Sequence, residues 1–121
     1  MLTCIKSQRQ RNAAEYALKV IQSSCIKPYI QSIYLYGSCA RGEEKYSSDV
    51  DLFLELSESF RSRPELKKYI YLLKSEVSSA ELDDAETDLK VVVGDEWKKN
   101  KMLIMRMYER REFRYGLKQL L

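Results

Sequence analysis

Three aspartates head apolar stretches of this sequence, where carboxylates are not expected. Asp49 and Asp51 open the stretch DVDLFLEL, and Asp88 opens DLKVVV. An ionised carboxylate is costly to bury unless it is paired, so some charged group must be drawing these side chains to that position. Carboxylate oxygens are the ligands that hard divalent cations prefer. We therefore expect Asp49, Asp51 and Asp88 to bind Mg²⁺ or Mn²⁺.

The histidine and cysteine content of the chain argues against zinc sites and against histidine-activated nucleophiles. The chain has no histidine, and its three cysteines, Cys4, Cys25 and Cys39, show no CxxC spacing. Zinc sites of the Cys/His kind and Ser-His or Cys-His dyads are therefore not expected. We interpret Cys39 as a small packing residue rather than as a redox switch.

The size and charge of the chain limit the classes of protein to which it can belong. With 121 residues, 45% of them hydrophobic, the sequence predicts a single domain over residues 1–121 that has no room for a separate acceptor-binding domain. A net charge of +3, from 21 basic and 18 acidic residues, argues against a dedicated nucleic-acid binder. No stretch resembles a signal peptide or a membrane span, so we expect a cytoplasmic protein without membrane contact.

Hydrophobic periodicity predicts an α/β (α+β) chain, with a small mixed sheet of about three strands flanked by helices. Helical spacing extends over residues 8–25 and 64–79, strand patterns over 29–36, 49–56 and 87–93, and a last helical stretch over 95–121 with a break near Gly116. The apolar and basic residues of the last stretch spread over more than one helix face. It is either a partner surface or a core helix with snorkelling basic side chains.

The order of these elements predicts where the aspartates meet. If the first two strands pair antiparallel, the Gly-Ser turn that ends the first lies beside Asp49 and Asp51. A right-handed crossover through the second helix makes the third strand parallel to the second and brings Asp88 to the same edge. Three carboxylates and a Gly-Ser turn at one sheet edge are the layout of a divalent-metal and phosphate site.

The residues around the turn form a recognisable signature. They are Gly37, Ser38, Ala40, Arg41, Gly42, Ser48, Asp49, Asp51 and Leu52, with ten residues between Ser38 and Asp49. This pattern resembles the polymerase-β-like nucleotidyltransferase superfamily, and most closely its minimal nucleotidyltransferase (MNT) branch, whose members are often encoded beside HEPN-domain partners in toxin-antitoxin pairs. The resemblance covers residues 33–56 strongly and, with Asp88, nearly the whole predicted order of elements. The Gly-Ser pair at 37–38 and the Asp-x-Asp motif at 49–51 are far more specific together, at this spacing, than either motif is alone.

The resemblance implies a nucleotide-binding role for four residues. Gly37 permits close approach of the backbone, and Ser38 offers a hydroxyl and an amide to the phosphates of ATP. Arg41 and Lys90 are candidates for neutralising the phosphates. The alternative for both basic residues is an ordinary solvated side chain.

The resemblance also implies a catalytic role for the three aspartates. Asp49 and Asp51 would each hold a Mg²⁺ ion, while Asp88 would complete the ligands of a second ion and accept the proton of the attacking hydroxyl. The implied reaction is attack on the α-phosphate of a nucleoside triphosphate with loss of pyrophosphate.

Three functions are compatible with these residues. The first is transfer of AMP (AMPylation) to a hydroxyl of a protein partner, for which the resemblance implies a HEPN toxin with a modifiable tyrosine and thus an antitoxin role for this chain. The second is transfer to a small molecule or an RNA end, and the third is a non-catalytic antitoxin that only binds its partner. The short chain disfavours the second, and three carboxylates held together against their repulsion disfavour the third.

Overall fold

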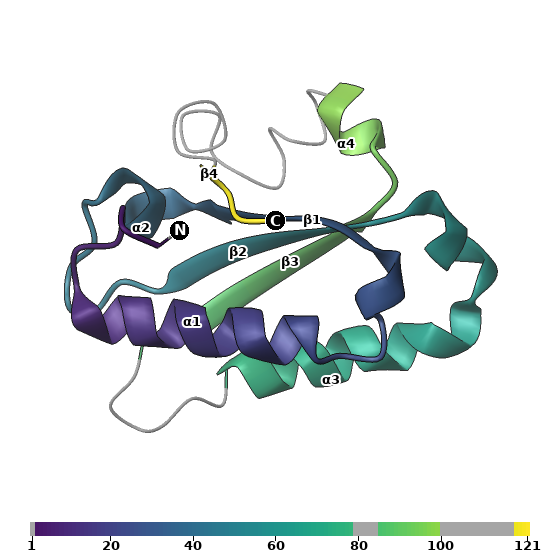
Figure 1. Ribbon diagram of the computed structural model, residues 1–121, viewed down its shortest axis with the longest axis horizontal. Coiled ribbons are helices and arrows are strands. Elements are labelled where there is room, and N and C mark those ends of the chain that lie inside the picture. The colour runs from purple at the N-terminus through teal and green to yellow at the C-terminus, as the bar shows by residue number, and fades with distance from the viewer. Residues whose placement is uncertain (1, 79–84, 100–117) are drawn as a thin grey trace.

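The computed structural model describes residues 2–78, 85–99 and 118–121. Within these residues four strands form one mixed sheet in the order β3-β2-β1-β4, and two long helices lie beside it (Figure 1). The elements are α1 (Gln8–Gln22), β1 (Ile30–Tyr36), α2 (Gly37–Arg41), β2 (Val50–Leu56), α3 (Lys67–Ser78), β3 (Thr87–Val93), α4 (Glu96–Lys99) and β4 (Lys118–Gln119), with single 3₁₀ turns at η1 (Lys27–Tyr29), η2 (Glu58–Ser62) and η3 (Pro64–Leu66).

The strand pairing confirms the predicted topology. β1 and β2 pair antiparallel, and β2 and β3 pair parallel across the α3 crossover. The three longer strands flanked by helices are the small mixed sheet that the sequence predicts. β3 spans the predicted residues, and β1 and β2 each begin one residue later than predicted. The alternation of large apolar residues is clear in these segments, which is why their bounds could be predicted closely.

Three local predictions were less accurate. α1 ends at Gln22 instead of near Cys25, because the following backbone N–H groups fold back onto the last helical carbonyls and a 3₁₀ turn with Pro28 follows. Pro64 opens η3, and α3 begins only at Lys67. The connection after β1 contains a short helix, α2, which ends at Gly42 in the left-handed conformation with φ of 67°.

The C-terminal end corrects the prediction of a helix over residues 95–121. Lys118 and Gln119 form a strand that pairs antiparallel with Leu35 and Tyr34 of β1. This pairing satisfies backbone groups along an edge of β1 that β2 leaves open. Residues 100–117 of the predicted helix, and with them the choice between core helix and partner surface, lie outside the described residues.

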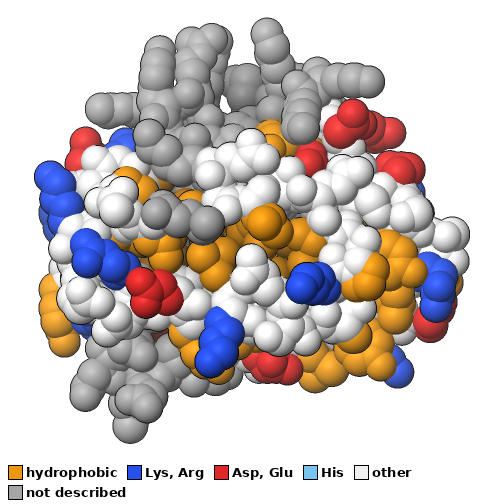
Figure 2. Space-filling view, in the orientation of Figure 1, with side chains coloured by type: hydrophobic (Ala, Val, Ile, Leu, Met, Phe, Trp, Pro, Cys, Tyr) orange, Lys and Arg blue, Asp and Glu red, His pale blue; other side chains and the backbone are white. Residues whose placement is uncertain are grey.

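The core lies between the sheet and the two long helices. The helices contribute Ala13, Ala14, Ala17, Ile21, Leu73 and Val77, and β2 contributes Val50, Leu52, Leu54 and Leu56. Hydrophobic side chains are visible between α1 and the strands in Figure 2. Because strand side chains alternate, the other residues of β2 face away from the helices, and Phe53 packs there in a separate aromatic cluster. No helix among the described residues is long and apolar enough to cross a membrane.

Candidate active site

Asp51 and Asp88 lie side by side on the face of the sheet opposite α1 and α3. Both are Cα partners in the parallel β2–β3 register, and Tyr36 of β1 stands on the other side of Asp51 in the same row. Neighbouring strands are about 4.8 Å apart, so the two carboxylates start from adjacent backbone positions on one face. The structure therefore places these two aspartates next to each other, as the sequence predicts.

Asp49 lies near this pair but outside the strand. It is an exposed residue immediately before β2 begins at Val50. Its backbone carbonyl accepts a contact from the Cys39 thiol, with Sγ 3.5 Å from the oxygen, which links α2 to the start of β2. Among the described residues, no three acidic or cysteine side chains converge closely enough to hold a metal ion as they stand. The backbone thus brings the three aspartates to one corner of the sheet without drawing their carboxylates together.

Gly37 makes room for the Asp51 carboxylate. Its φ of 74° lies in the left-handed region, where residues with a Cβ are strained. A Cβ built at this position would collide with Oδ2 of Asp51 and lie 3.3 Å from its Cγ. The first residue of the Gly-Ser turn is therefore a glycine for two independent reasons, its backbone conformation and its contact with the site carboxylate.

Of the two predicted basic residues, Lys90 lies in the site beside Asp88. Its Nζ is 3.3 Å from Oδ2 of Asp88, and both side chains are partly exposed. Arg41 is the last residue of α2, and its Nε is 3.1 Å from Oε2 of Glu43. The structure thus pairs Lys90 with a site carboxylate and Arg41 with a residue of the following loop. Ser38 is partly buried in the first turn of α2.

Gln10 is a site-supporting residue that the sequence did not reveal. This fully buried side chain of α1 donates through Nε2 to the backbone carbonyls of Lys45, Tyr46 and Ser48, at 2.9, 3.1 and 3.1 Å. These carbonyls belong to the loop that leads into Asp49. Gln10 therefore anchors the segment that delivers the first aspartate, and no local pattern in α1 indicates a contact so distant in sequence.

Replacing Gln10 with leucine is expected to destabilise the protein by about 1–3 kcal/mol, because three part-buried loop carbonyls lose their donor. The free energy of unfolding can be measured by urea denaturation. Gln22→Leu is the matched control, since Gln22 is an exposed residue at the end of the same helix. An equal loss in both variants would show that the Gln10 contacts do not contribute.

Glu44 anchors the same loop at a second point. Its Oε1 accepts the backbone N–H groups of Ser7, at 2.7 Å, and of Lys6. Burial acts to raise the pKa of Glu44, but these hydrogen bonds outweigh it and hold the pKa below its ordinary value. The segment before α1 and the segment before β2 are therefore held together through the ionised form of one carboxylate.

Cys39 is buried beside the site and is not set up as a nucleophile. Its side chain is fully buried within the core cluster. Burial, reinforced by the negative charges of Glu44 and Asp51, raises the pKa of the thiol to about 12. The thiol therefore stays protonated at neutral pH, in agreement with its interpretation as a packing residue.

An aromatic cluster continues the site face beyond the two aspartates. Tyr34, Phe53 and Trp97 pack edge-on or tilted, with ring centroids 4.9–6.1 Å apart. Trp97 of α4 also donates through Nε1 to the carboxylate of Glu55, which is only 2% exposed. Strand alternation places Phe53 and Glu55 on the face of Asp51, but only the structure shows that Trp97 returns to cover them.

The chain is similar to one known protein family and to a solved structure. The model of the family described as polymerase beta, nucleotidyltransferase matches residues 19–113, a range that contains all the predicted site residues. No curated protein sequence matches the chain. One similar solved structure is a protein from Sulfolobus solfataricus described provisionally as a nucleotidyltransferase. It is 18% identical, with a TM-score of 0.48, and the match covers 92% of this chain and 78% of that one.

Proposed function

The chain belongs to the polymerase beta nucleotidyltransferase family, and from that premise we propose that it transfers AMP from ATP to a hydroxyl of a protein partner. The family supports nucleotidyl transfer in general, and the choice of donor and acceptor is our proposal. The observation that carries it is the row in which Asp51 and Asp88 stand side by side next to the Gly37 turn. A row of this kind can bring a triphosphate and an attacking hydroxyl together on the face of the sheet opposite α1 and α3.

The acidic residues are chemically suited to Mg²⁺ or Mn²⁺. Asp49, Asp51 and Asp88 offer only oxygen ligands, the type that these hard ions prefer, and Gly37 leaves space around one of them. A bound divalent ion would supply positive charge to the phosphate oxygens during in-line displacement. Lys90, whose Nζ is 3.3 Å from Oδ2 of Asp88, would offer its ammonium group to the phosphates.

Other residues of the chain would bind the triphosphate and accept the proton of the attacking hydroxyl. The backbone and hydroxyl of Ser38 would hold the triphosphate at the turn, with Arg41 nearby as a counter-charge. The acceptor oxygen then attacks the α-phosphorus, the bond to the bridging oxygen breaks, and pyrophosphate leaves. Asp88 would accept the proton of the attacking hydroxyl, since it is the more exposed of the paired carboxylates.

The resemblance to the MNT branch supports a specific acceptor for this reaction. We propose that the acceptor is a HEPN-domain toxin encoded beside this chain, and that its modification neutralises it. The test is to incubate the chain with Mg²⁺-ATP and the product of the neighbouring gene, and then to measure the mass of that product. One added AMP is expected. If the neighbouring protein binds but is never modified, the chain acts as a non-catalytic antitoxin instead.

Nucleotide binding is expected to depend on the divalent cation. Without Mg²⁺, the triphosphate would face the site carboxylates directly, so we expect the affinity for ATP to fall at least about ten-fold. Calorimetric titration of ATP with Mg²⁺ and with a chelator in its place measures the difference. Equal affinity in the two titrations would contradict the assignment of a metal to Asp49, Asp51 and Asp88.

A further inference from the structure

A groove of about 550 Å³ runs between α3 and the C-terminal half of β3. Ile70 of α3 and Val91 and Val93 of β3 line it with half-buried apolar side chains. Tyr71, which also lines it, is 72% exposed. Because apolar surface that remains in contact with water is stabilised when a partner covers it, the groove is a candidate docking surface.

Basic side chains line the groove as well. Lys67 and Lys74 lie seven residues apart on α3, which separates them by about 10 Å along the helix axis. Among the described residues, no carboxylate lies within ion-pair distance of either ammonium group, and none of those that line the groove is acidic. Two such positive charges beside apolar surface favour a partner with acidic groups next to apolar ones.

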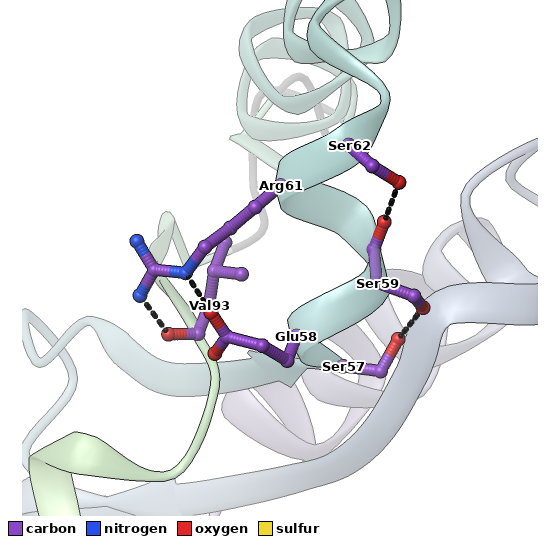
Figure 3. Close-up of polar contacts among 6 residues, drawn as sticks. All are labelled: Ser57, Glu58, Ser59, Arg61, Ser62 and Val93. Atoms are coloured by element: carbon purple, nitrogen blue, oxygen red, sulfur yellow. Dashed lines mark hydrogen bonds and ion pairs between the residues drawn. The ribbon is translucent and has the colours of Figure 1, made fainter.

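Arg61 of η2 fixes one end of the groove. It donates through Nη2 to the backbone carbonyl of Val93 at 3.0 Å, and its Nε pairs with Glu58, as Figure 3 shows. In the same turn, the hydroxyl of Ser62 donates to the carbonyl of Ser59 at 2.7 Å. These contacts join η2 to the end of β3, so this end of the groove is formed before a partner binds.

The shape of the groove favours an amphipathic helix over a small molecule. Tyr71 and Lys67 line it with exposed side chains, so a small ligand would keep much of its surface in water, whereas pockets for such ligands bury most of it. A helix beside α3 packs with its axis about 8–10 Å away and can carry carboxylates at the two-turn spacing of Lys67 and Lys74. Apolar side chains between those carboxylates then meet the half-buried apolar residues of the groove.

Two other occupants fit the charges less well. A second copy of this chain, with the same groove facing it, would bring like charges together. Nucleic acid would match the lysines, but Glu58 beside Arg61 would repel a continuous phosphate backbone. A helix can instead place its carboxylates opposite Lys67 and Lys74 alone.

We propose that an acidic amphipathic helix of a protein partner docks in this groove. Two of its carboxylates, two turns apart, pair with Lys67 and Lys74. The residues of β3 that line the groove pack toward α3, whereas Asp88 shares the opposite side of the sheet with Asp51, so the helix docks away from the candidate active site. The docking is measured without nucleotide, so the inference does not depend on the proposed transfer of AMP.

The experiment uses a peptide of about fourteen residues, or about four helical turns, with two glutamates seven residues apart, leucines between them on the same face, and alanine and glutamine elsewhere. It is titrated to millimolar concentration into the chain with ¹³C-labelled methyl groups. The methyl signals of Ile70, Val91 and Val93 should shift, while those of Val92, which packs against the aromatic cluster, should stay unchanged. A peptide with the same residues spread over all faces, and one with a central proline, should bind at least about ten-fold more weakly.

Charge variants test the choice of partner. The double variant Lys67→Glu/Lys74→Glu should weaken binding of the acidic peptide at least about ten-fold and should strengthen binding of a peptide with lysine in place of glutamate. Lys68→Glu is the control, because Lys68 neighbours Lys67 on α3 without lining the groove, and its Nζ lies over the ring of Tyr69. Unchanged groove signals at millimolar peptide, equal binding of the proline peptide, an oligonucleotide that shifts these signals instead, or dimerisation through the groove would each overturn the proposal. Docking of the peptide without AMP transfer by any version would leave the docking surface standing and refute only the proposed reaction.

Discussion

Replacing Asp51 with asparagine is expected to abolish AMP transfer while leaving the fold intact. The amide cannot serve as an anionic metal ligand, and even residues outside the first ligand layer typically change metal affinity or activity ten- to a hundred-fold, so we expect a loss of at least about a hundred-fold. Stability should be equal or higher, because asparagine has nearly the same shape and no longer repels the adjacent Asp88.

The measurement is the mass of the partner protein after incubation with Mg²⁺-ATP, together with the urea midpoint of each variant. Asp95→Asn is the matched control, since Asp95 is exposed and follows the opposite end of β3. Undiminished modification by the Asp51→Asn protein would refute the proposed mechanism. A large fall in its urea midpoint would instead assign Asp51 a structural role.

Replacing Gly37 with alanine is expected to remove nucleotide binding and to lower the stability. Forcing a residue with a Cβ into the left-handed conformation costs about 1–2 kcal/mol, and the new methyl group would also displace the Asp51 carboxylate. We therefore expect the affinity for Mg²⁺-ATP to fall at least about ten-fold. Calorimetry measures the affinity, and urea denaturation measures the free energy of unfolding.

Gly94→Ala separates these two effects. Gly94 has a φ of 79°, and a Cβ there would collide with a carboxylate oxygen of Glu58, so the backbone strain and the type of collision match those at Gly37. Gly94 lies just past the far end of β3, away from Asp88. Both variants should lose similar stability, but only Gly37→Ala should lose nucleotide binding. Similar losses of binding in both would mean that general destabilisation explains the effect.

Strand alternation was sufficient to assign the faces of the sheet from the sequence. The apolar residues of β2 had to share one side, so Asp51 had to share the other with Phe53. The α3 connection between β2 and β3 then required a parallel pair, because a crossover of that length returns the chain in the same direction. The corner of the sheet that holds the aspartates follows from these two facts.

The sequence by itself determined the residue types of the site, their strands and the corner where they gather, because these depend on short-range periodicity and chain connectivity. Only the tertiary structure decided the register that sets Asp51 opposite Asp88, since a shift of two residues would leave every side chain on the same face and so changes no local pattern. The same holds for Gln10 and for β4, which contact residues far away in the chain. Such contacts depend on three-dimensional proximity, which no local spacing of residues encodes.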